Sequence, residues 1–508
     1  MGKITIGSEN LTLEQLVDIC RNRAIIEISE EAKERVRKSR KIVDDIVENE
    51  KVIYGITTGF GKFSDVNISQ EDCKLLQKNL IISHACGYGD SLSEEIVRAV
   101  MVLRINNLTK GYSGIRLETL ETLVNMVNNG VHPIIPEKGS LGASGDLAPL
   151  SHMVLPMLGE GKAIFNGTEY SGREAMEKAG IDIIELTAKE GLALINGTQV
   201  MTAVGAITLY DSLNLIKCTD IVAALTVEAL RGITDAYDHR THEIRPHEGQ
   251  INTARNMLKL VENSTYVTKQ GEIRVQDAYT LRCIPQVHGA SKDAIKYIKE
   301  KVEIEMNSVT DNPIVMDNGE VISGGNFHGQ PMALAFDFLG IAMAEMANIS
   351  ERRLERLINY QLSGDLPAFL VKSGGLNSGF MITQYAAAAL VSENKVLAHP
   401  ASVDSIPSSA NQEDHVSMGT IAARKGRDIV NNCYRVLATE ALAACQAIDF
   451  REGYKLGKGT QVAYDCIRKS VEFIEKDVVM YEKLDICTDI LKNERLLKSV
   501  EEVVKIEV

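Results

Sequence analysis

The tripeptide Ala143-Ser144-Gly145 has the residue types that a backbone cyclisation needs. The Gly145 amide nitrogen can attack the Ala143 carbonyl carbon and close a five-membered ring with loss of water. Elimination of the Ser144 hydroxyl then leaves an alkene conjugated to a carbonyl, which is an electrophile. Glycine supplies an unhindered nitrogen and a flexible backbone. A bare Ala-Ser-Gly triplet is far more often a glycine-rich turn, here with a helix cap at Asp146, so its surroundings must decide.

Two other segments could be taken for a phosphate-binding loop and a metal site, but their residue spacing does not support either. The glycine-rich segment 54–63 resembles a phosphate-binding loop, but its glycines are spaced too widely and Phe63 stands where serine or threonine is required. His239, His242 and His247 form a local cluster without a fourth ligand pattern. We interpret that cluster as a solvated loop and expect no metal site.

Long helices must position these loops. Beyond Thr198, apolar residues recur at steps of three and four, which predicts helices over 199–232, 331–362, 381–398 and 416–448. Long, alanine-rich helices with few strands predict a mainly α protein with a long central helical bundle. The stretch 111–195 is rich in glycine and proline, and we expect it to be loop-rich and functional.

The first hundred residues differ from this pattern. Short helical patterns alternate there with glycine-rich turns, and Thr12 with Gln15 predicts a capping box at a helix start. We predict a smaller, loop-rich mixed N-terminal domain at 1–110 and a helical domain at 111–508.

Composition limits the classes of function and partner. The formal net charge of −14 argues against a broad basic face for nucleic acid. The nine cysteines are odd in number and form no CxxC pair, which favours reduced thiols in a cytoplasm. The longest uncharged stretch, 373–392, contains Gly, Ser, Asn and Gln and is interpreted as a loop entering a buried helix rather than a membrane span. We expect a soluble cytoplasmic protein.

The twelve residues GSLGASGDLAPL at 139–150 resemble the signature of the ammonia-lyase and aminomutase family that acts on histidine, phenylalanine and tyrosine. Other segments are similar to that family in the same order along nearly the whole chain: YGITTGFGKF (54–63), NLIISHACG (79–87), LALINGTQ (192–199), VQDAYTLRC (275–283), GGNFHGQP (324–331) and SANQEDHVSM (409–418). The resemblance implies that residues 143–145 mature autocatalytically into 4-methylidene-imidazol-5-one, with no external cofactor.

The resemblance also implies roles for residues on either side of the triplet. Tyr54 matches the candidate base for the substrate β-proton, although the pKa of a free tyrosine, about 10, would have to be lowered. Asn196 matches the residue that hydrogen-bonds the prosthetic group or the substrate amine. The alternatives are a packing tyrosine and an ordinary Asn-Gly turn.

Four further residues are expected to bind substrate. Arg282 can grip an amino-acid carboxylate because its planar guanidinium makes two charge-assisted hydrogen bonds. Gln276 and Tyr279 are expected at the same site, and Phe327 is expected to line the pocket. The alternative for Arg282 is a surface salt bridge, and the alternative for Phe327 is a position in the hydrophobic core.

The choice of substrate depends on His84 and Glu413. The family's tyrosine-type enzymes can also carry histidine at position 84, so Glu413 is the more telling residue. A carboxylate can hold an imidazole N–H, whereas a phenyl ring offers none and would leave the acid unpaired. The alternative for Glu413 is an acid at a helix start. Either Tyr54 or Glu413 remains a candidate base.

We therefore expect a carbon–nitrogen lyase that removes ammonia from L-histidine to give urocanate, the first step of histidine degradation. The resemblance implies a homotetramer with each site shared by three subunits. A tyrosine or phenylalanine lyase or aminomutase with the same prosthetic group is the nearest alternative. A catalytically inactive helical scaffold is the alternative from another class.

Overall fold

The computed structural model describes residues 2–49, 51–53, 55–59, 68 and 70–508, with the backbone alone at 70 and 71. Contacts divide the chain into two compact units, each built from segments that are distant in sequence. Unit 1 comprises 1–210, 299–337 and 400–424, and unit 2 comprises 211–298, 338–399 and 425–508. These contacts do not test whether residues 1–110 fold as a domain, so that boundary stays a prediction.

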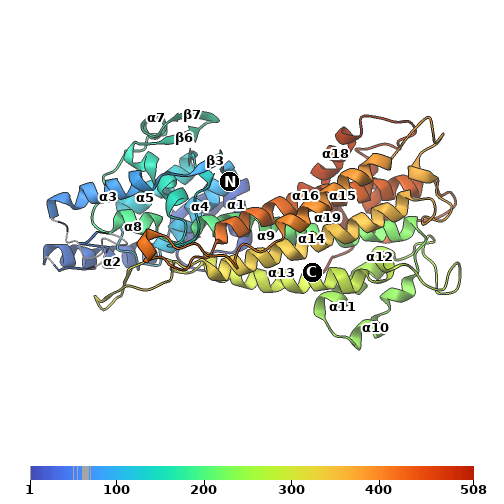
Figure 1. Ribbon diagram of the computed structural model, residues 1–508, viewed down its shortest axis with the longest axis horizontal. Coiled ribbons are helices and arrows are strands. Elements are labelled where there is room, and N and C mark those ends of the chain that lie inside the picture. The colour runs from blue at the N-terminus through green and yellow to red at the C-terminus, as the bar shows by residue number, and fades with distance from the viewer. Residues whose placement is uncertain (1, 50, 54, 60–67, 69) are drawn as a thin grey trace. The chain divides into compact units, whose positions relative to one another are not determined.

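Helices dominate the structure, as the mainly α prediction required (Figure 1). Four of the five unit boundaries fall within long helices: α9 (Gln199–Ala229), α13 (Ile284–Met306), α14 (Gln330–Ile358) and α16 (Gly419–Asp449). Three of these were predicted, and α13 was not. α14 is long and apolar enough to cross a membrane by length and composition, but 67% of its apolar window is buried, as in a core helix.

Unit 1 contains short helices and small sheets. Its other helices are α1 (Leu13–Arg21), α2 (Glu30–Glu48), α3 (Gln70–His84), α4 (Glu94–Leu108), α5 (Leu117–Asn129), α6 (Leu147–Val154), η2 (Leu155–Leu158), α7 (Gly172–Lys178), α8 (Glu190–Ile195) and η5 (Ser409–Asn411). Three pairs of strands are β1 (Lys3–Ile6) with β2 (Ile25–Ile28), β3 (Tyr88–Ser91) with β5 (Pro136–Lys138), and β8 (Ile314–Val315) with β9 (Val321–Ile322). A three-stranded antiparallel sheet has the order β4 (Val131–Pro133), β6 (Lys162–Phe165), β7 (Thr168–Ser171), with β6 in the middle. The predicted loop-rich stretch 111–195 is thus broken into short elements.

Unit 2 is almost wholly helical in its described residues. Besides its parts of the long helices it contains η3 (Thr234–Tyr237), α10 (His239–Glu243), α11 (Glu248–Leu260), α12 (Tyr279–Arg282), η4 (Ala368–Leu370), α15 (Met381–Leu397), α17 (Lys458–Arg468), α18 (Met480–Lys492) and α19 (Arg495–Glu501). The predicted helix at 381–398 corresponds to α15.

Local sequence signals explain several of these elements. Thr12 and Gln15 form the predicted capping box at the start of α1. Gly205 lets α9 approach α14 closely, since a Cβ there would lie 1.9 Å from the ring of Phe336. α16 begins three residues later than predicted, because Met418 has a left-handed φ of 57°.

The core of unit 2 contains a chain of buried charges on the four long helices. Glu440 accepts from the Arg353 guanidinium at 2.5 and 3.0 Å, and Arg353 Nη1 lies 3.1 Å from His288 Nε2. Arginine can only donate, so Nε2 accepts and Nδ1 donates to Asp220 at 2.7 Å. Lys292 donates to the same Asp220 carboxylate at 2.6 Å. Such a fully paired chain fixes the register of α9, α13, α14 and α16 in this unit.

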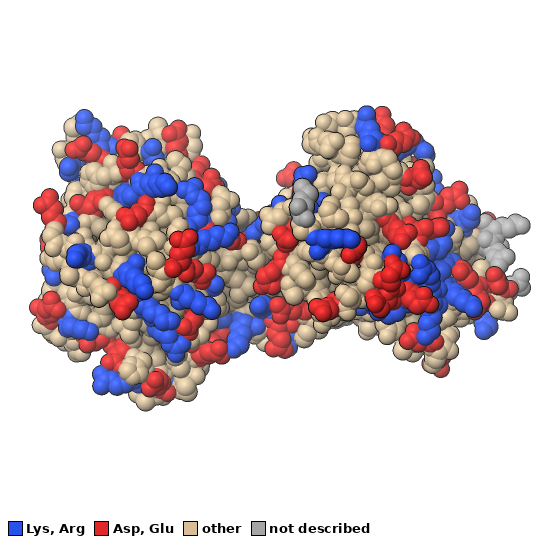
Figure 2. All heavy atoms as spheres, turned by 180° about the vertical axis from the view of Figure 1, so that it is seen from behind, with Lys and Arg blue, Asp and Glu red and all other residues tan. Residues whose placement is uncertain are grey.

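Acidic and basic side chains are interspersed on the face of the molecule shown in Figure 2. Among the described residues, no group of three or more His, Cys, Asp or Glu side chains has the geometry to hold a metal ion. All nine cysteines are free thiols. The interpretation of the histidine cluster as a solvated loop is wrong for His242, which is 1% exposed and bonded to Gln250 and to the Ala236 carbonyl.

Candidate active site

The loop that carries the Ala-Ser-Gly triplet lies between β5 and α6 and depends on glycine. Gly142 and Gly145 have φ values of 71° and 75°, which side chains disfavour. A Cβ on Gly145 would lie 2.0 Å from the Gly197 carbonyl oxygen, and the Asp146 amide donates to that oxygen at 2.8 Å. Position 145 therefore requires glycine both for its conformation and for the close approach of the 196–198 segment.

Asp146 anchors this loop to the first turn of α9. Its buried carboxylate accepts the amide hydrogens of Val200 at 2.9 Å and Met201 at 2.8 Å, and the hydroxyls of Ser140 and Thr420 donate to its other oxygen. Burial nevertheless raises the pKa of the carboxyl above its ordinary value. Asp146 also precedes α6, but its side chain makes no capping bond there. The helix cap considered from sequence thus belongs to α9, where an anion is favoured by the helix dipole.

Ser144 and Glu413 meet directly. The Ser144 hydroxyl donates to Glu413 Oε1 at 3.0 Å, and the Ser408 hydroxyl donates to Oε2 at 3.1 Å. A short antiparallel bridge pairs Ser408 with Glu413, and the turn between them holds three successive left-handed residues, 409–411. The helix-start alternative for Glu413 is wrong, because α16 begins only at Gly419.

The segment that follows Glu413 is bonded to the triplet loop. Met418 N donates to the Leu141 carbonyl at 3.0 Å, and the Ser417 hydroxyl donates to the Gly142 carbonyl at 3.2 Å. These contacts explain the late start of α16, since its expected first residues are bonded to the triplet loop. Ser144 and Glu413, 269 residues apart, are thereby held together.

His84 is the last residue of α3 and is half-buried. Its Nδ1 lies 3.0 Å from the Ser83 hydroxyl. Burial lowers the pKa of its imidazole, and the nearby Glu413 carboxylate acts in the opposite direction. The two residues expected to select the substrate are therefore within electrostatic range of each other.

Asn196 caps the C-terminus of α8 and is 4% exposed. Its side-chain Oδ1 has no hydrogen-bond partner among the described residues, an arrangement that costs free energy unless a ligand supplies a donor. The buried Arg104 donates to the main-chain carbonyls of Ala193 at 3.1 Å and Asn196 at 2.9 Å. Arg104 thus fixes the backbone that faces the triplet.

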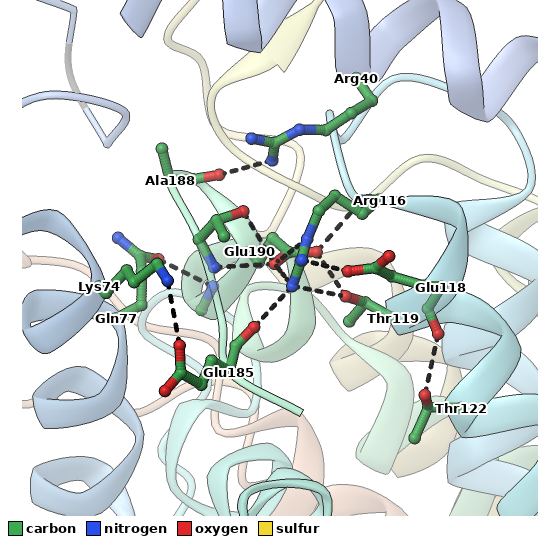
Figure 3. A network of polar contacts seen from close by, with 12 residues as sticks. Arg40, Lys74, Gln77, Arg116, Glu118, Thr119, Thr122, Glu185, Ala188 and Glu190 are labelled. Carbon is green, nitrogen blue, oxygen red and sulfur yellow. Dashed lines mark hydrogen bonds and ion pairs between the residues drawn. The ribbon is translucent and has the colours of Figure 1, made fainter. Parts of the chain in front are cut away.

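The start of α8 is held by a buried polar network (Figure 3). Both oxygens of Glu190, which is fully buried, are bonded: Arg116 donates through its amide and its Nε, Thr119 through its hydroxyl, and Thr187 through its amide and its hydroxyl. Gln77 Oε1 accepts the Gly191 amide at 2.8 Å. Sequence reasoning missed this network and Arg104. A sequence signal for buried polar contacts did exist, because Arg98 and Arg104 interrupt the otherwise apolar pattern of α4.

Phe327 is half-buried in the loop that precedes α14. The next residue, His328, stacks on His415 with ring centroids 5.9 Å apart, and its Nε2 lies 3.3 Å from the His415 carbonyl. A Cβ on Gly329 would lie 2.9 Å from the Ser417 hydroxyl. The loop of Phe327 therefore packs against the loop of Glu413.

Three of the remaining predicted residues belong to unit 2. Gln276, Tyr279 and Arg282 lie in unit 2, where Tyr279 and Arg282 form the short helix α12. Gln276 and Tyr279 are exposed, and the Arg282 guanidinium lies 4.6 Å from the Tyr279 ring centroid. Arg282 Nε is buried without a partner among the described residues. Tyr54 lies outside the described residues.

The fold and the site define a helical protein whose reactive loop is anchored to the first turn of a long helix and faces a half-buried carboxylate. A family model described as aromatic amino acid lyase matches residues 11–469, and the chain belongs to that family.

Individual relatives agree with this assignment. The chain is 69% identical to the histidine ammonia-lyase of Clostridium tetani, with 99% of each protein covered. The crystal structure of histidine ammonia-lyase from Trypanosoma cruzi superposes with a TM-score of 0.93 at 42% identity, covering 99% of this chain and 96% of that one. The tyrosine aminomutase from Streptomyces globisporus superposes with a TM-score of 0.95 at 38% identity, with 99% of each chain covered.

Proposed function

We propose that the chain catalyses the non-oxidative elimination of ammonia from L-histidine, giving urocanate in the first step of histidine degradation. Full-length relatives named histidine ammonia-lyase, at 69% and 66% identity, support this substrate. The observation that carries the proposal is the placement of Glu413, which accepts from Ser144 at 3.0 Å and lies within electrostatic range of His84. An imidazole ring gives both residues a polar partner, which a phenyl ring cannot do.

The residues around the triplet fit a 4-methylidene-imidazol-5-one formed from Ala143, Ser144 and Gly145. Gly145 has no Cβ to prevent its close approach to Gly197, so the backbone at the end of the triplet can pack tightly. Held by the loop of residues 143–145, that group would supply an electrophilic carbon, which is the chemistry needed to turn an amine nitrogen into a better leaving group. No external cofactor is proposed.

The protein's own side chains then orient the substrate and move its protons. Glu413 and His84 hold the imidazole, and Asn196 accepts a hydrogen bond from the amine. Tyr54 or Glu413 removes the β-proton, and the two remain alternative bases. Burial lowers the pKa of His84, so this imidazole stays neutral near pH 7 and can accept as well as donate.

A second set of residues would bind the other end of the substrate. Arg282 pairs with the carboxylate through its planar guanidinium, with Gln276 and Tyr279 beside it and Phe327 lining the pocket. Within unit 2, the exposed Tyr279 and the buried unpartnered Arg282 Nε support a role in binding a ligand. We propose a cytoplasmic homotetramer in which three subunits share each site. A fully active monomer in sedimentation would contradict that assembly.

A substrate panel tests the reaction. Purified full-length protein is expected to produce the ultraviolet absorbance of urocanate from L-histidine. A cinnamate-type spectrum from phenylalanine or tyrosine, without activity on histidine, would overturn the substrate. The likeness to a tyrosine aminomutase makes that activity the second candidate, and release of a β-amino acid would identify it. Intact mass tests the inactive scaffold, because the matured ring lacks two waters relative to the encoded chain.

A further inference from the structure

Unit 2 contains a cavity of about 310 Å³ whose lining shares only Gln276 with the residues proposed to bind substrate. Its walls come from the two residues that follow α9, the segment 273–281, the last turn of α14 with the chain after it, and Arg451. Four arginines line it, together with two aspartates: Arg231, Arg274, Arg356, Arg451, Asp277 and Asp365. Since a water molecule takes up roughly 30 Å³ in the liquid, the cavity has room for a polyatomic ligand.

The positive charges of this cavity are only partly compensated. Asp277 pairs with Arg274 at 2.5 Å. The ion pair between Asp365 and Arg451 is weaker, because its atoms are 3.4 Å apart and the Asp365 side chain is 87% exposed. Arg231 and Arg356 have no carboxylate within ion-pair distance among the described residues. Two arginines and two aspartates cancel, so the lining has an excess of two positive charges, which favours an anionic occupant.

Two buried polar atoms on the same lining lack partners. Ser363 is 3% exposed, and its hydroxyl has no hydrogen bond among the described residues. Arg231 Nε is also buried and unpartnered, although the guanidinium lies 4.9 Å from the centroid of the Tyr454 ring. Arg231 itself has a left-handed φ of 52°, a conformation that non-glycine residues adopt only when their surroundings enforce it. A hydroxyl and a guanidinium that both lack acceptors match the oxygens of one ligand.

We propose that this cavity binds a small oxyanion, with Arg231, Arg356 and the Ser363 hydroxyl as its donors. Phosphate and carboxylate groups share the required chemistry, because both offer several acceptor oxygens to planar guanidinium groups. Gln276 lines the same cavity, and Asp277 accepts the Ile233 amide at 2.6 Å. A bound oxyanion would therefore stiffen the segment that leads into α12. This site does not depend on the proposed lyase reaction.

Calorimetric titration of the full-length protein with inorganic phosphate tests the site directly. Succinate forms a second arm that distinguishes a carboxylate from a phosphate ligand, and sodium chloride at equal ionic strength controls for screening. We expect saturable binding of at least one oxyanion. Replacing one charge-assisted donor, in Arg231→Gln, should weaken binding about tenfold or more.

Matched variants locate the binding. Ser363→Ala should also weaken it, yet leave the anion-free protein as stable as before, because the lost hydroxyl had no partner. Arg240→Gln is the control, since Arg240 is an exposed arginine of the same unit that pairs with Asp238. If Arg231→Gln fails to fold, Arg356→Gln takes its place. Absence of binding by both oxyanions, or equal binding by all variants, would overturn the proposal. The titration needs no turnover, so its failure is separate from failure of the proposed reaction.

Discussion

Glu190 and Glu413 lie in the same compact unit, yet their carboxylates have very different surroundings. Glu190 is completely buried and receives hydrogen bonds from Arg116, Thr119 and Thr187 on both of its oxygens. Glu413 is half-buried, and among the described residues it receives two hydroxyl hydrogen bonds, from Ser144 and Ser408. Within that part of the chain, the Glu190 carboxylate is saturated with donors, whereas the Glu413 carboxylate has acceptor positions left for a ligand.

The hydrogen bonding of each carboxylate distinguishes an acid that holds the fold together from one that is available to a ligand. A buried charge with saturated hydrogen bonds holds its neighbours in one arrangement, and here it fixes the start of α8, whose other end carries Asn196. The Glu413 carboxylate lies beside the Ser144 hydroxyl and has acceptor positions left, so it can accept a hydrogen bond from a bound ligand. Substitutions at the two sites should therefore affect different measurements.

Ser144→Ala should have the largest effect, because it removes the hydroxyl that cyclisation eliminates. We expect kcat for histidine to fall by about a thousandfold or more, the scale seen when a covalent catalytic group is lost. Far-ultraviolet circular dichroism and the unfolding midpoint should stay unchanged. Full activity in this variant would refute the role of residues 143–145.

Glu413→Gln keeps the size of the side chain and removes its charge. As a base or a ligand for the imidazole, Glu413 should contribute about 10²- to 10⁴-fold to kcat/KM. Stability should change by about 1 kcal/mol or less, because the glutamine side-chain oxygen can still accept one of the two hydroxyl hydrogen bonds. Asp414→Asn is the matched control on the adjacent, exposed residue. Equal kinetics for the two variants would remove Glu413 from the reaction.

Glu190→Gln should have the opposite effect: a large loss of folding stability, with no direct effect on the groups proposed to contact substrate. Removing one partner of a buried ion pair typically destabilises a protein by about 3–5 kcal/mol, so urea unfolding should shift strongly. Glu118→Gln is the control, because Glu118 pairs with the same Arg116 but its side chain is 65% exposed. Its effect should be at most about 1 kcal/mol. Similar shifts for both variants would show that burial does not distinguish these acids.

Glu228 is another buried acid, and unlike Glu190 it has one side-chain oxygen without a hydrogen-bond donor among the described residues. Burial raises the pKa of its carboxyl to about 7, and one of its oxygens accepts the Gly457 amide at 2.8 Å. Because the folded state binds this proton more tightly than the unfolded state, stability from this group is full below about pH 4.5 and is lost as pH rises to about 7.

Glu228→Gln should remove that loss. At pH 8 the variant should be more stable than the parent by up to about 3 kcal/mol, with little difference at pH 4.5. Unfolding midpoints at the two pH values provide the measurement. A variant that is destabilised equally at both would contradict the raised pKa.

The sequence was most informative where the physical cause is local. The capping box at Thr12 depends on residues three apart, and the helical spacing after Thr198 predicted α9 to within three residues of its end. The residue types at 143–145 allow a backbone cyclisation, but only the surrounding residues favour it over an ordinary glycine-rich turn. The resemblance of the surrounding twelve residues indicated the family that the comparison then established.

Contacts between distant segments were decided only by the tertiary structure. No local pattern shows that Asp146 caps α9, that Arg104 holds the carbonyl of Asn196, or that Met418 turns out of the helix. Each of these depends on which backbone groups the fold leaves without partners, and hydrogen bonding across long sequence separations settles that. The spacing of apolar residues was therefore enough to predict α9, α14, α15 and α16 but not α13. Contacts between distant segments were needed to place Ser144 against Glu413 and to saturate the Glu190 carboxylate with donors.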